Sequence, residues 1–150
     1  MYQRILVPVD GSDTARRGLE EAIRLSKALG GALRLVHIID DTPLAMNPET
    51  GIAAAPLVAD FAEGGKQIIE ESRAFAAGEG VQVDTALYEN FTGRVAERIL
   101  EDARKSGAEL IVMGTHGRRG IRHAVLGSDA EAVVRGSHVP VLLVRAPGRK

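Results

Sequence analysis

The sequence lacks cysteine and tryptophan altogether, and aromatic residues make up only 3% of it. The absence of cysteine excludes a disulfide framework, catalysis by a thiol and metal sites built from thiolates. A cysteine-free chain suits a reducing compartment, so we expect a cytoplasmic protein.

Long apolar runs and an excess of positive charge are also missing. Charged residues interrupt every hydrophobic segment before it reaches the roughly 20 residues that cross a bilayer, and the opening residues, Met1–Asp10, read as a strand rather than a secretion signal. The 19 basic and 20 acidic residues leave a formal net charge of -1, which provides no overall positive field for a polyanion. We therefore expect neither a membrane nor nucleic acid as a partner.

The chain alternates between segments typical of strands and of helices, within a length of 150 residues that suits a single domain, 1–150. Arg4–Val9 is a short apolar run that ends in a turn, and Leu33–Ile39 is apolar without strict alternation, as in a strand covered on both faces. Between them, apolar residues recur at helical spacing over Asp13–Leu29. Further on, the pattern predicts a helix at 58–77, a strand at 81–88, a helix at 92–105, a strand at 109–113, a short helix from Ser128 and a last strand at Val139–Val144.

This alternation predicts an α/β fold, a doubly wound parallel sheet of five strands with helices on both faces. Each strand, helix and strand in succession implies a right-handed crossover. In such sheets ligands bind at the carboxyl ends of the strands, where the strand order reverses.

The segment with the clearest chemical character follows the strand at 109–113. It runs Gly114-Thr115-His116-Gly117, then nine residues, then Gly127-Ser128 at the start of a helix. Glycine lets backbone N–H groups approach a bulky anion, and a helix start adds unpaired N–H groups and a positive dipole end. Positive charge is available within the loop from Arg118, Arg119 and Arg122.

Simpler interpretations exist for the same residues. Ser128 and Glu131 have the S-x-x-E spacing of a capping box, which by itself explains a serine at a helix start. The arginines, taken alone, are typical of a solvated surface. His116 and His123 lie seven residues apart, where a metal pair is less expected than hydrogen bonding or contact with phosphate.

Several catalytic motifs are missing. The sequence contains neither the Walker phosphate loop with its lysine nor G-x-G-x-x-G after the first strand, and it has no G-x-S-x-G or H-E-x-x-H. His37, in an apolar strand, is expected to be a hydrogen-bonded core histidine, and His138 to face solvent. No residue is identified as a catalytic base.

Four segments together resemble the universal stress protein family over nearly the whole chain. The spacing Gly114-x-x-Gly117, nine residues, Gly127-Ser128 is similar to the ATP-binding motif of that family. The other three are Ile5–Asp13 (ILVPVDGSD), His37–Asp40 (HIID) and Val139–Val144 (VPVLLV). The resemblance implies a Rossmann-like fold of the adenine nucleotide alpha hydrolase type.

The resemblance also implies a site for ATP, alone or with Mg²⁺. Asp10, with Pro8 close by, is the candidate for the ribose or adenine, Ile38 for the adenine pocket, and Met113 for the sugar or base. The implied phosphate residues are Gly114, His116, Gly117, Gly127, Ser128, Asp129 and Ala130. Asp129 is a departure, because the family often has an apolar residue there; its carboxylate either points away and favours the helix dipole or helps to hold Mg²⁺.

A site shared by Asp10 and the loop after Gly114 requires the first and fourth strands to be neighbours. This favours the strand order 3-2-1-4-5 over 2-1-3-4-5. Pro140, near the start of the last strand, suggests an edge position, and an apolar edge invites pairing with another copy. The resemblance implies the same, a homodimer joined through Val139–Val144.

The sequence thus predicts an ATP- or AMP-binding protein that acts in the stress response as a sensor or regulator. Enzymatic activity is not required, and slow hydrolysis of ATP is the most it would include. The alternative is an interaction or dimerisation module of the same fold that binds no nucleotide.

Overall fold

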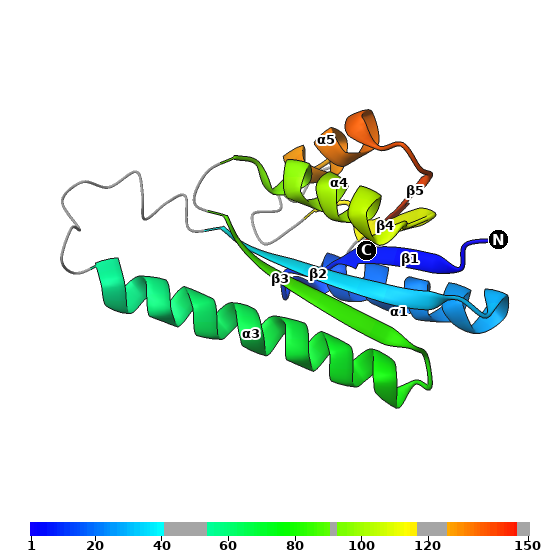
Figure 1. The fold of residues 1–150 in the computed structure, drawn as a ribbon, viewed down its shortest axis with the longest axis horizontal. Coiled ribbons are helices and arrows are strands. Elements are labelled where there is room, and N and C mark those ends of the chain that lie inside the picture. Colours follow the sequence, from blue (N-terminus) through cyan, green and yellow to red (C-terminus); the bar gives the residue numbers. More distant parts are fainter. Residues whose placement is uncertain (41–53, 91–92, 117–125, 147–150) are drawn as a thin grey trace.

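Five parallel strands form one sheet in the order β3-β2-β1-β4-β5, as Figure 1 shows for the computed structural model. The structure describes residues 1–40, 54–90, 93–116 and 126–146. The strands are β1 (Arg4–Pro8), β2 (Ala32–Asp40), β3 (Val83–Asn90), β4 (Leu110–Gly114) and β5 (Val141–Val144). The predicted strand order is confirmed.

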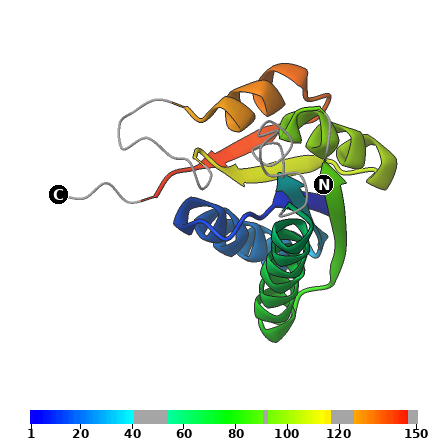
Figure 2. The same cartoon turned by 90° about the vertical axis from the view of Figure 1, so that its left-hand side faces the viewer.

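Helices cover both faces of the sheet, which Figure 2 shows from the side. Within the described ranges these are α1 (Asp13–Leu29), α3 (Ala54–Gly78), α4 (Val95–Ser106) and α5 (Ser128–Gly136). Helices α1 and α3 lie on one face, and α4 and α5 on the other. The doubly wound architecture predicted from the alternation of segments is therefore confirmed.

The unbroken apolar run of β1 supplies both cores because successive side chains of a strand point to opposite faces. Ile5 and Val7 pack beneath α1 and α3, whereas Leu6 packs beneath α4 and α5. All three side chains are completely buried, and burial of each contributes about 1.5–3 kcal/mol. The central strand is thus held from both sides, and its carboxyl end has a fixed position.

The first helix begins and ends where its sequence predicts. The Ser12 side chain accepts a hydrogen bond from the backbone N–H of Ala15 at 3.2 Å and so caps α1. At the other end Gly30 adopts φ +73°, and its N–H donates to the Ser26 carbonyl at 2.8 Å. These caps fix the position of the turn between β1 and α1.

Some boundaries differ from the predicted ones for identifiable reasons. β3 begins at Val83 rather than Val81, because its pairing with β2 starts with Leu33 opposite Val83, just after the Gln82 carbonyl accepts from the Leu33 N–H at 2.8 Å. β5 begins at Val141, since Pro140 has no N–H to donate to a neighbouring strand. The Pro140 carbonyl nevertheless accepts from the N–H of Ile111 at 3.0 Å. The edge position that Pro140 suggested for the last strand is confirmed.

None of the described helices combines the length and the apolar character that a membrane span would need.

Candidate functional site

The turn after β1 is built around Asp10. Its Oδ1 accepts a hydrogen bond from the backbone N–H of Ser12 at 2.8 Å, which is the local bond that favours aspartate in turns. Gly11 between them takes φ +80°, a conformation that costs glycine little. Asp10 is half-buried, so its carboxylate is both oriented by the turn and accessible.

The loop after β4 is anchored at its two described ends. The Thr115 N–H donates to the Val144 carbonyl of β5 at 3.0 Å, and the Gly127 N–H donates to the Thr115 carbonyl at 2.8 Å. The start of α5 is therefore held beside the end of β4. Gly117 and the three loop arginines, Arg118, Arg119 and Arg122, lie outside the described residues.

The Asp10 turn and the β4 loop meet at the carboxyl end of the sheet. β1 and β4 are parallel neighbours, with Ile5 paired to Leu110 and Leu6 to Ile111, so their carboxyl ends lie side by side. The hydroxyl of Thr14, in the first turn of α1, donates to the backbone carbonyl of His116. This bond joins the Asp10 turn directly to the β4 loop, at the point where the strand order reverses.

The glycines of the β4 loop have a structural role that the sequence argument missed. A Cβ atom on Gly114 would lie 2.7 Å from the carbonyl carbon of Thr14 and 2.8 Å from its oxygen. One on Gly127 would lie 2.8 Å from the Thr115 carbonyl oxygen. Backbone atoms cannot yield as side-chain ends can, so both positions need glycine whether or not an anion binds.

The expected capping box at the start of α5 is wrong. Gly127, with φ −60° and ψ 150°, is the N-cap residue, and no side-chain bond caps this end. Ser128 is instead the first residue of the helix and is exposed. Glu131 pairs with Arg135 at 2.7 Å rather than reaching back to the helix start. Capping therefore does not account for the serine.

The other predicted site residues fall into two groups. Pro8 ends β1, paired with Val36 of β2, and Asp129 is exposed in the first turn of α5. Three side chains are buried in the core beneath α4 and α5, namely Ile38, Met113 and Ala130 with exposures of 7%, 6% and 2%. The core therefore takes up most of the side-chain surface of these three residues.

His37 and His138 behave as their sequence positions suggested, whereas His123 lies outside the described residues. His37 is buried, and its Nδ1 lies 2.7 Å from the carbonyl oxygen of Val9, so the protonated nitrogen donates there. His138 is exposed. His116 is half-buried, with its Nδ1 3.0 Å from the Thr115 hydroxyl. No group of three potential metal ligands occurs among the described parts of the chain.

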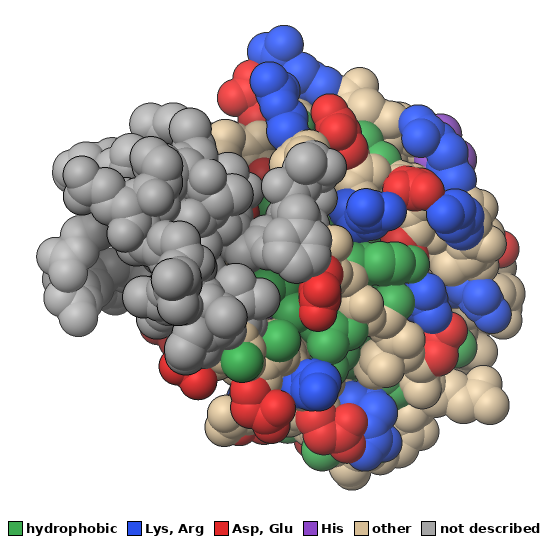
Figure 3. Space-filling model, turned by 60° about the vertical axis from the view of Figure 1, so that its left-hand side comes forward, with side chains coloured by type: hydrophobic (Ala, Val, Ile, Leu, Met, Phe, Trp, Pro, Cys, Tyr) green, Lys and Arg blue, Asp and Glu red, His purple; other side chains and the backbone are tan. Residues whose placement is uncertain are grey.

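Sequence reasoning missed two features near the site. Thr14 was not identified, although a hydroxyl in the first turn of a helix after a strand is a recognisable signal. A hollow of about 180 Å³ also lies on the face covered by α1 and α3, between Val9, Asp13 and Glu71. On the face drawn in Figure 3, acidic and basic side chains are interspersed around exposed hydrophobic ones, without a field of one sign.

Comparison with known proteins tests whether the resemblance to the universal stress protein family extends over the whole chain. Residues 1–145 match the universal stress protein family. The chain belongs to this family. Universal stress protein MJ0531 of Methanocaldococcus jannaschii is 32% identical over 151 residues, which cover 100% of this chain and 86% of that protein.

Solved structures of universal stress proteins share the architecture. The structure of MJ0577, a protein of M. jannaschii, has a TM-score of 0.87 at 27% identity and covers 99% of both chains. A universal stress protein in complex with cAMP has a TM-score of 0.65 at 26% identity, covering 96% of this chain and 97% of that one. The Rossmann-like fold implied by the sequence is thus confirmed.

Proposed function

We propose that this protein binds an adenine nucleotide, ATP or AMP, in the crevice between the Asp10 turn and the start of α5. The observation that carries the proposal is the bond from Thr14 to His116, which joins the Asp10 turn to the β4 loop at the reversal of strand order. The Gly127 N–H, bonded to the Thr115 carbonyl, holds the start of α5 beside the same loop. Open α/β sheets bind their ligands at such points.

Each end of the crevice offers chemistry that suits part of a nucleotide. Asp10 commits Oδ1 to the Ser12 N–H, so we assign Oδ2 to a ribose hydroxyl. At the other end, the backbone N–H groups of Ser128, Asp129 and Ala130 begin a helix whose N-cap residue supplies no side chain. N–H groups at a helix start bind phosphate oxygens without a lysine.

The adenylate assignment is supported by the related universal stress protein that was solved with cAMP. We assign the base to the edge of the sheet at Pro8, Ile38 and Met113, and the phosphates to Gly114, His116, Gly127 and the start of α5, with Gly117 completing the glycine pattern. Mg²⁺ would accompany ATP as its usual counter-ion and is not required by any cluster of ligands in the described parts of the chain.

The role we propose is regulation in the stress response, in the cytoplasm, rather than catalysis. Asp10 is oriented by its turn, and we assign no residue the part of a general base. Slow hydrolysis of ATP and an interaction module without nucleotide are the alternatives. Analysis of nucleotide products after prolonged incubation separates a binder from a hydrolase.

Calorimetric titration with ATP, AMP and adenosine tests the site at Asp10. Asp10→Asn keeps an oxygen for the Ser12 N–H, so the turn persists while the charge is lost. We expect about tenfold weaker binding of all three ligands, as for loss of one charge-assisted hydrogen bond. Asp13→Asn is the matched control because Asp13 is exposed in the first turn of α1, and its affinities should stay within about twofold. Absence of adenylate binding by the unmodified protein contradicts the proposal.

Ser128→Asp tests the phosphate end separately. Aspartate is favoured in the first turn of a helix, so the fold should persist, but its carboxylate would repel a phosphate. We expect weaker binding of ATP and AMP and unchanged binding of adenosine. Equal losses for all three ligands would place the phosphates elsewhere.

We also propose a homodimer joined through the free edge of β5. This strand is at the end of the sheet, and Leu142 within it is 38% exposed. An apolar edge strand with unpaired backbone groups is a template for a second copy.

A further inference from the structure

The hydroxyl of Thr14, in the first turn of α1, has contacts on two sides. It donates to the backbone carbonyl of His116, and its Oγ1 lies 3.3 Å from the Oγ of Ser12. A carbonyl oxygen can only accept a hydrogen bond, so the Thr14 proton is committed to His116 and the Ser12 hydroxyl is the donor to Thr14. These two contacts fix the direction of the Thr14 side chain.

The same series of hydrogen bonds reaches the carboxylate that we assign to the ribose. The backbone N–H of Ser12 donates to Oδ1 of Asp10 at 2.8 Å. Hydrogen bonds therefore run from Asp10 through the backbone and side chain of Ser12 to Thr14, and from there to His116. The series connects the ribose end of the proposed crevice with the loop at its phosphate end.

Hydrogen bonds from three different elements hold Thr115 and His116. The Thr115 N–H donates to the Val144 carbonyl of β5 at 3.0 Å, and the Thr115 carbonyl accepts from the Gly127 N–H at 2.8 Å. Both bonds join backbone groups, so they remain when a side chain is substituted. The third bond comes from the side chain of Thr14, and a substitution there removes it selectively.

Helix α1 is held against β4 independently of this hydroxyl. A Cβ atom on Gly18, one turn after Thr14, would lie only 3.2 Å from the backbone nitrogen of Gly114, and Leu19 beside it is 1% exposed in the core. Loss of the Thr14 hydroxyl should therefore release the β4 loop and leave the helix in place.

We propose that Thr14 is a positioning residue for the phosphate end of the nucleotide site. This inference rests on the proposed function. The bond from Thr14 keeps the His116 carbonyl turned towards α1 and holds the start of the loop at a fixed place relative to Asp10. A loop that is ordered before the ligand arrives loses less conformational entropy on binding. The hydroxyl should therefore strengthen binding of the phosphate group and contribute little to binding of the nucleoside.

Calorimetric titration of the full chain with adenosine and AMP tests this role. Thr14→Val keeps the branched shape of threonine without the hydroxyl, and Thr14→Ala leaves no group in its place. We expect both to weaken AMP binding about tenfold, as for loss of one hydrogen bond, and to bind adenosine within about twofold of the unmodified protein. Thr14→Ser retains the hydroxyl and should restore the ratio of AMP to adenosine affinity.

Ser26→Ala is the matched control on the same helix. The Ser26 hydroxyl donates to the Gly31 carbonyl at 2.5 Å, at the opposite end of α1. This substitution also removes a bond from a hydroxyl to a backbone carbonyl, but away from the crevice, so the ratio of AMP to adenosine affinity should stay unchanged. Far-ultraviolet circular dichroism verifies that all the variants are folded.

Amide hydrogen exchange of the ligand-free proteins measures the positioning directly. The Gly127 N–H is bonded to the Thr115 carbonyl, so it reports opening of the loop that Thr14 holds. It should exchange several-fold faster in Thr14→Val than in the unmodified protein or Ser26→Ala. Equal exchange in all three would overturn the inference without any measurement of nucleotide binding.

The titrations contradict the inference in two further ways. An unchanged ratio of AMP to adenosine affinity in Thr14→Val and Thr14→Ala would overturn it. Equal losses for both ligands would also overturn it, because that pattern follows from general damage to the fold. Failure of the proposed function has a different signature, since the unmodified protein would then bind neither ligand.

Discussion

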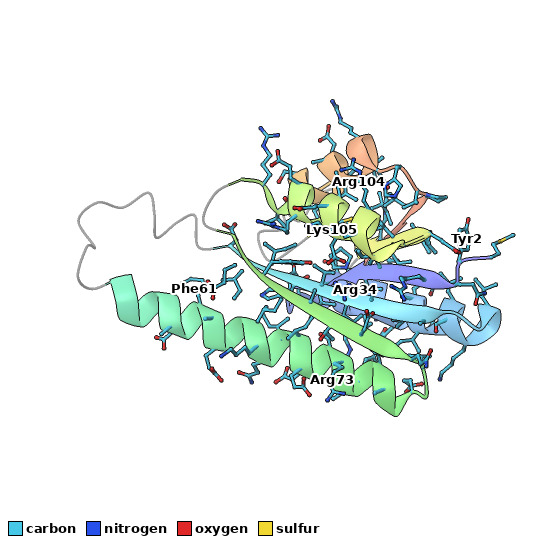
Figure 4. The ribbon with its side chains drawn as sticks, in the orientation of Figure 1. Tyr2, Arg34, Phe61, Arg73, Arg104 and Lys105 are labelled. Carbon is cyan, nitrogen blue, oxygen red and sulfur yellow. The ribbon has the colours of Figure 1, made fainter. Side chains whose placement is uncertain are left out.

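Arg34 in β2 holds the buried carboxylate of Asp102 in α4 with two hydrogen bonds, from Nε to Oδ1 at 3.0 Å and from Nη2 to Oδ2 at 2.8 Å. Tyr88 of β3 donates a third, from its hydroxyl to Oδ2 at 2.5 Å. Figure 4 labels Arg34 on the central part of the sheet. The Asp102 side chain is only 1% exposed, so this network fixes α4 across two strands, and α5 packs against α4.

Loss of the Asp102 charge should be far more damaging than loss of the other acidic partner of Arg34. Asp102→Asn leaves a guanidinium facing an amide in a buried place, and we expect the free energy of unfolding to fall by about 3 kcal/mol. Asp84 also pairs with Arg34, at 3.0 Å, but its side chain is 53% exposed. Asp84→Asn should cost about 0.5 kcal/mol or less. Urea unfolding measures both, and equal losses would contradict the prediction.

The same network predicts how stability depends on pH. Burial alone raises the pKa of Asp102, but the hydrogen bonds from Arg34 and Tyr88 outweigh it and hold that pKa below its ordinary range. The native state therefore binds this proton more weakly than the unfolded chain. The stabilisation by Asp102 is present above about pH 4 and is lost as the pH falls through the native pKa.

Urea unfolding of the unmodified protein and Asp102→Asn at pH 7 and pH 3 tests this sign. The difference in their free energies of unfolding should be smaller at pH 3. Tyr88→Phe removes one hydrogen bond that lowers the native pKa of Asp102, so the fall in its stability should be smaller and should end at a higher pH than that of the unmodified protein. A difference that stays constant between the two pH values would show that Asp102 is not the group responsible.

Adjacent glycines in α3 should respond in opposite ways to alanine. A Cβ on Gly65 would lie 2.8 Å from Cγ1 of Ile39 and 3.2 Å from Cδ2 of His37, whereas one on Gly64 meets nothing within 4 Å. We expect Gly65→Ala to destabilise the fold by about 1–3 kcal/mol through overpacking. Gly64→Ala should stabilise it by about 0.5–1 kcal/mol, because alanine loses less backbone entropy in a helix.

Thermal or urea unfolding compares the two variants directly. Adding Ile39→Val to Gly65→Ala removes one of the crowded methyl groups, so the double variant should lose less stability than the sum of the single ones. If Gly65→Ala were as stable as Gly64→Ala, α3 would not pack closely on β2 at this point.

Much of the architecture could be predicted because each local signal agreed with the fold. The apolar run of β1 contributes side chains to the cores on both faces of the sheet. A site shared by Asp10 and the Gly114 loop requires β1 and β4 to be neighbours, and this requirement predicted the strand order that is observed. Ser128 shows where such reasoning fails. Its S-x-x-E spacing with Glu131 indicated a cap at Ser128, but the helix begins one residue earlier than that pattern implies, with Gly127 as the N-cap.

The contacts of Gly114 and of Asp102 could not be predicted from the sequence, because each joins segments that are far apart in the chain. In the sequence, Gly114 suggests a position where an anion can approach the backbone. In the structure, the space that its Cβ would take is occupied by the backbone of Thr14, which belongs to a helix a hundred residues earlier in the chain. Arg34, Tyr88 and Asp102 come from three separate elements. Their association depends on tertiary register, which no periodicity within one segment specifies.

A charge on the free edge of β5 should separate the proposed dimer into monomers. Leu142 is 38% exposed on this strand, and Phe61, labelled on α3 in Figure 4, is 39% exposed. Lysine on an edge strand opposes pairing with a second copy, so Leu142→Lys should sediment as a monomer at micromolar concentration. Phe61→Lys removes an equally exposed apolar side chain from α3 and should leave the dimer intact. Because each substitution adds the same charge at a similar exposure, a difference between them assigns the contact to β5. Sedimentation of the unmodified protein as a monomer would refute the dimer, and dissociation of both variants would place the contact elsewhere.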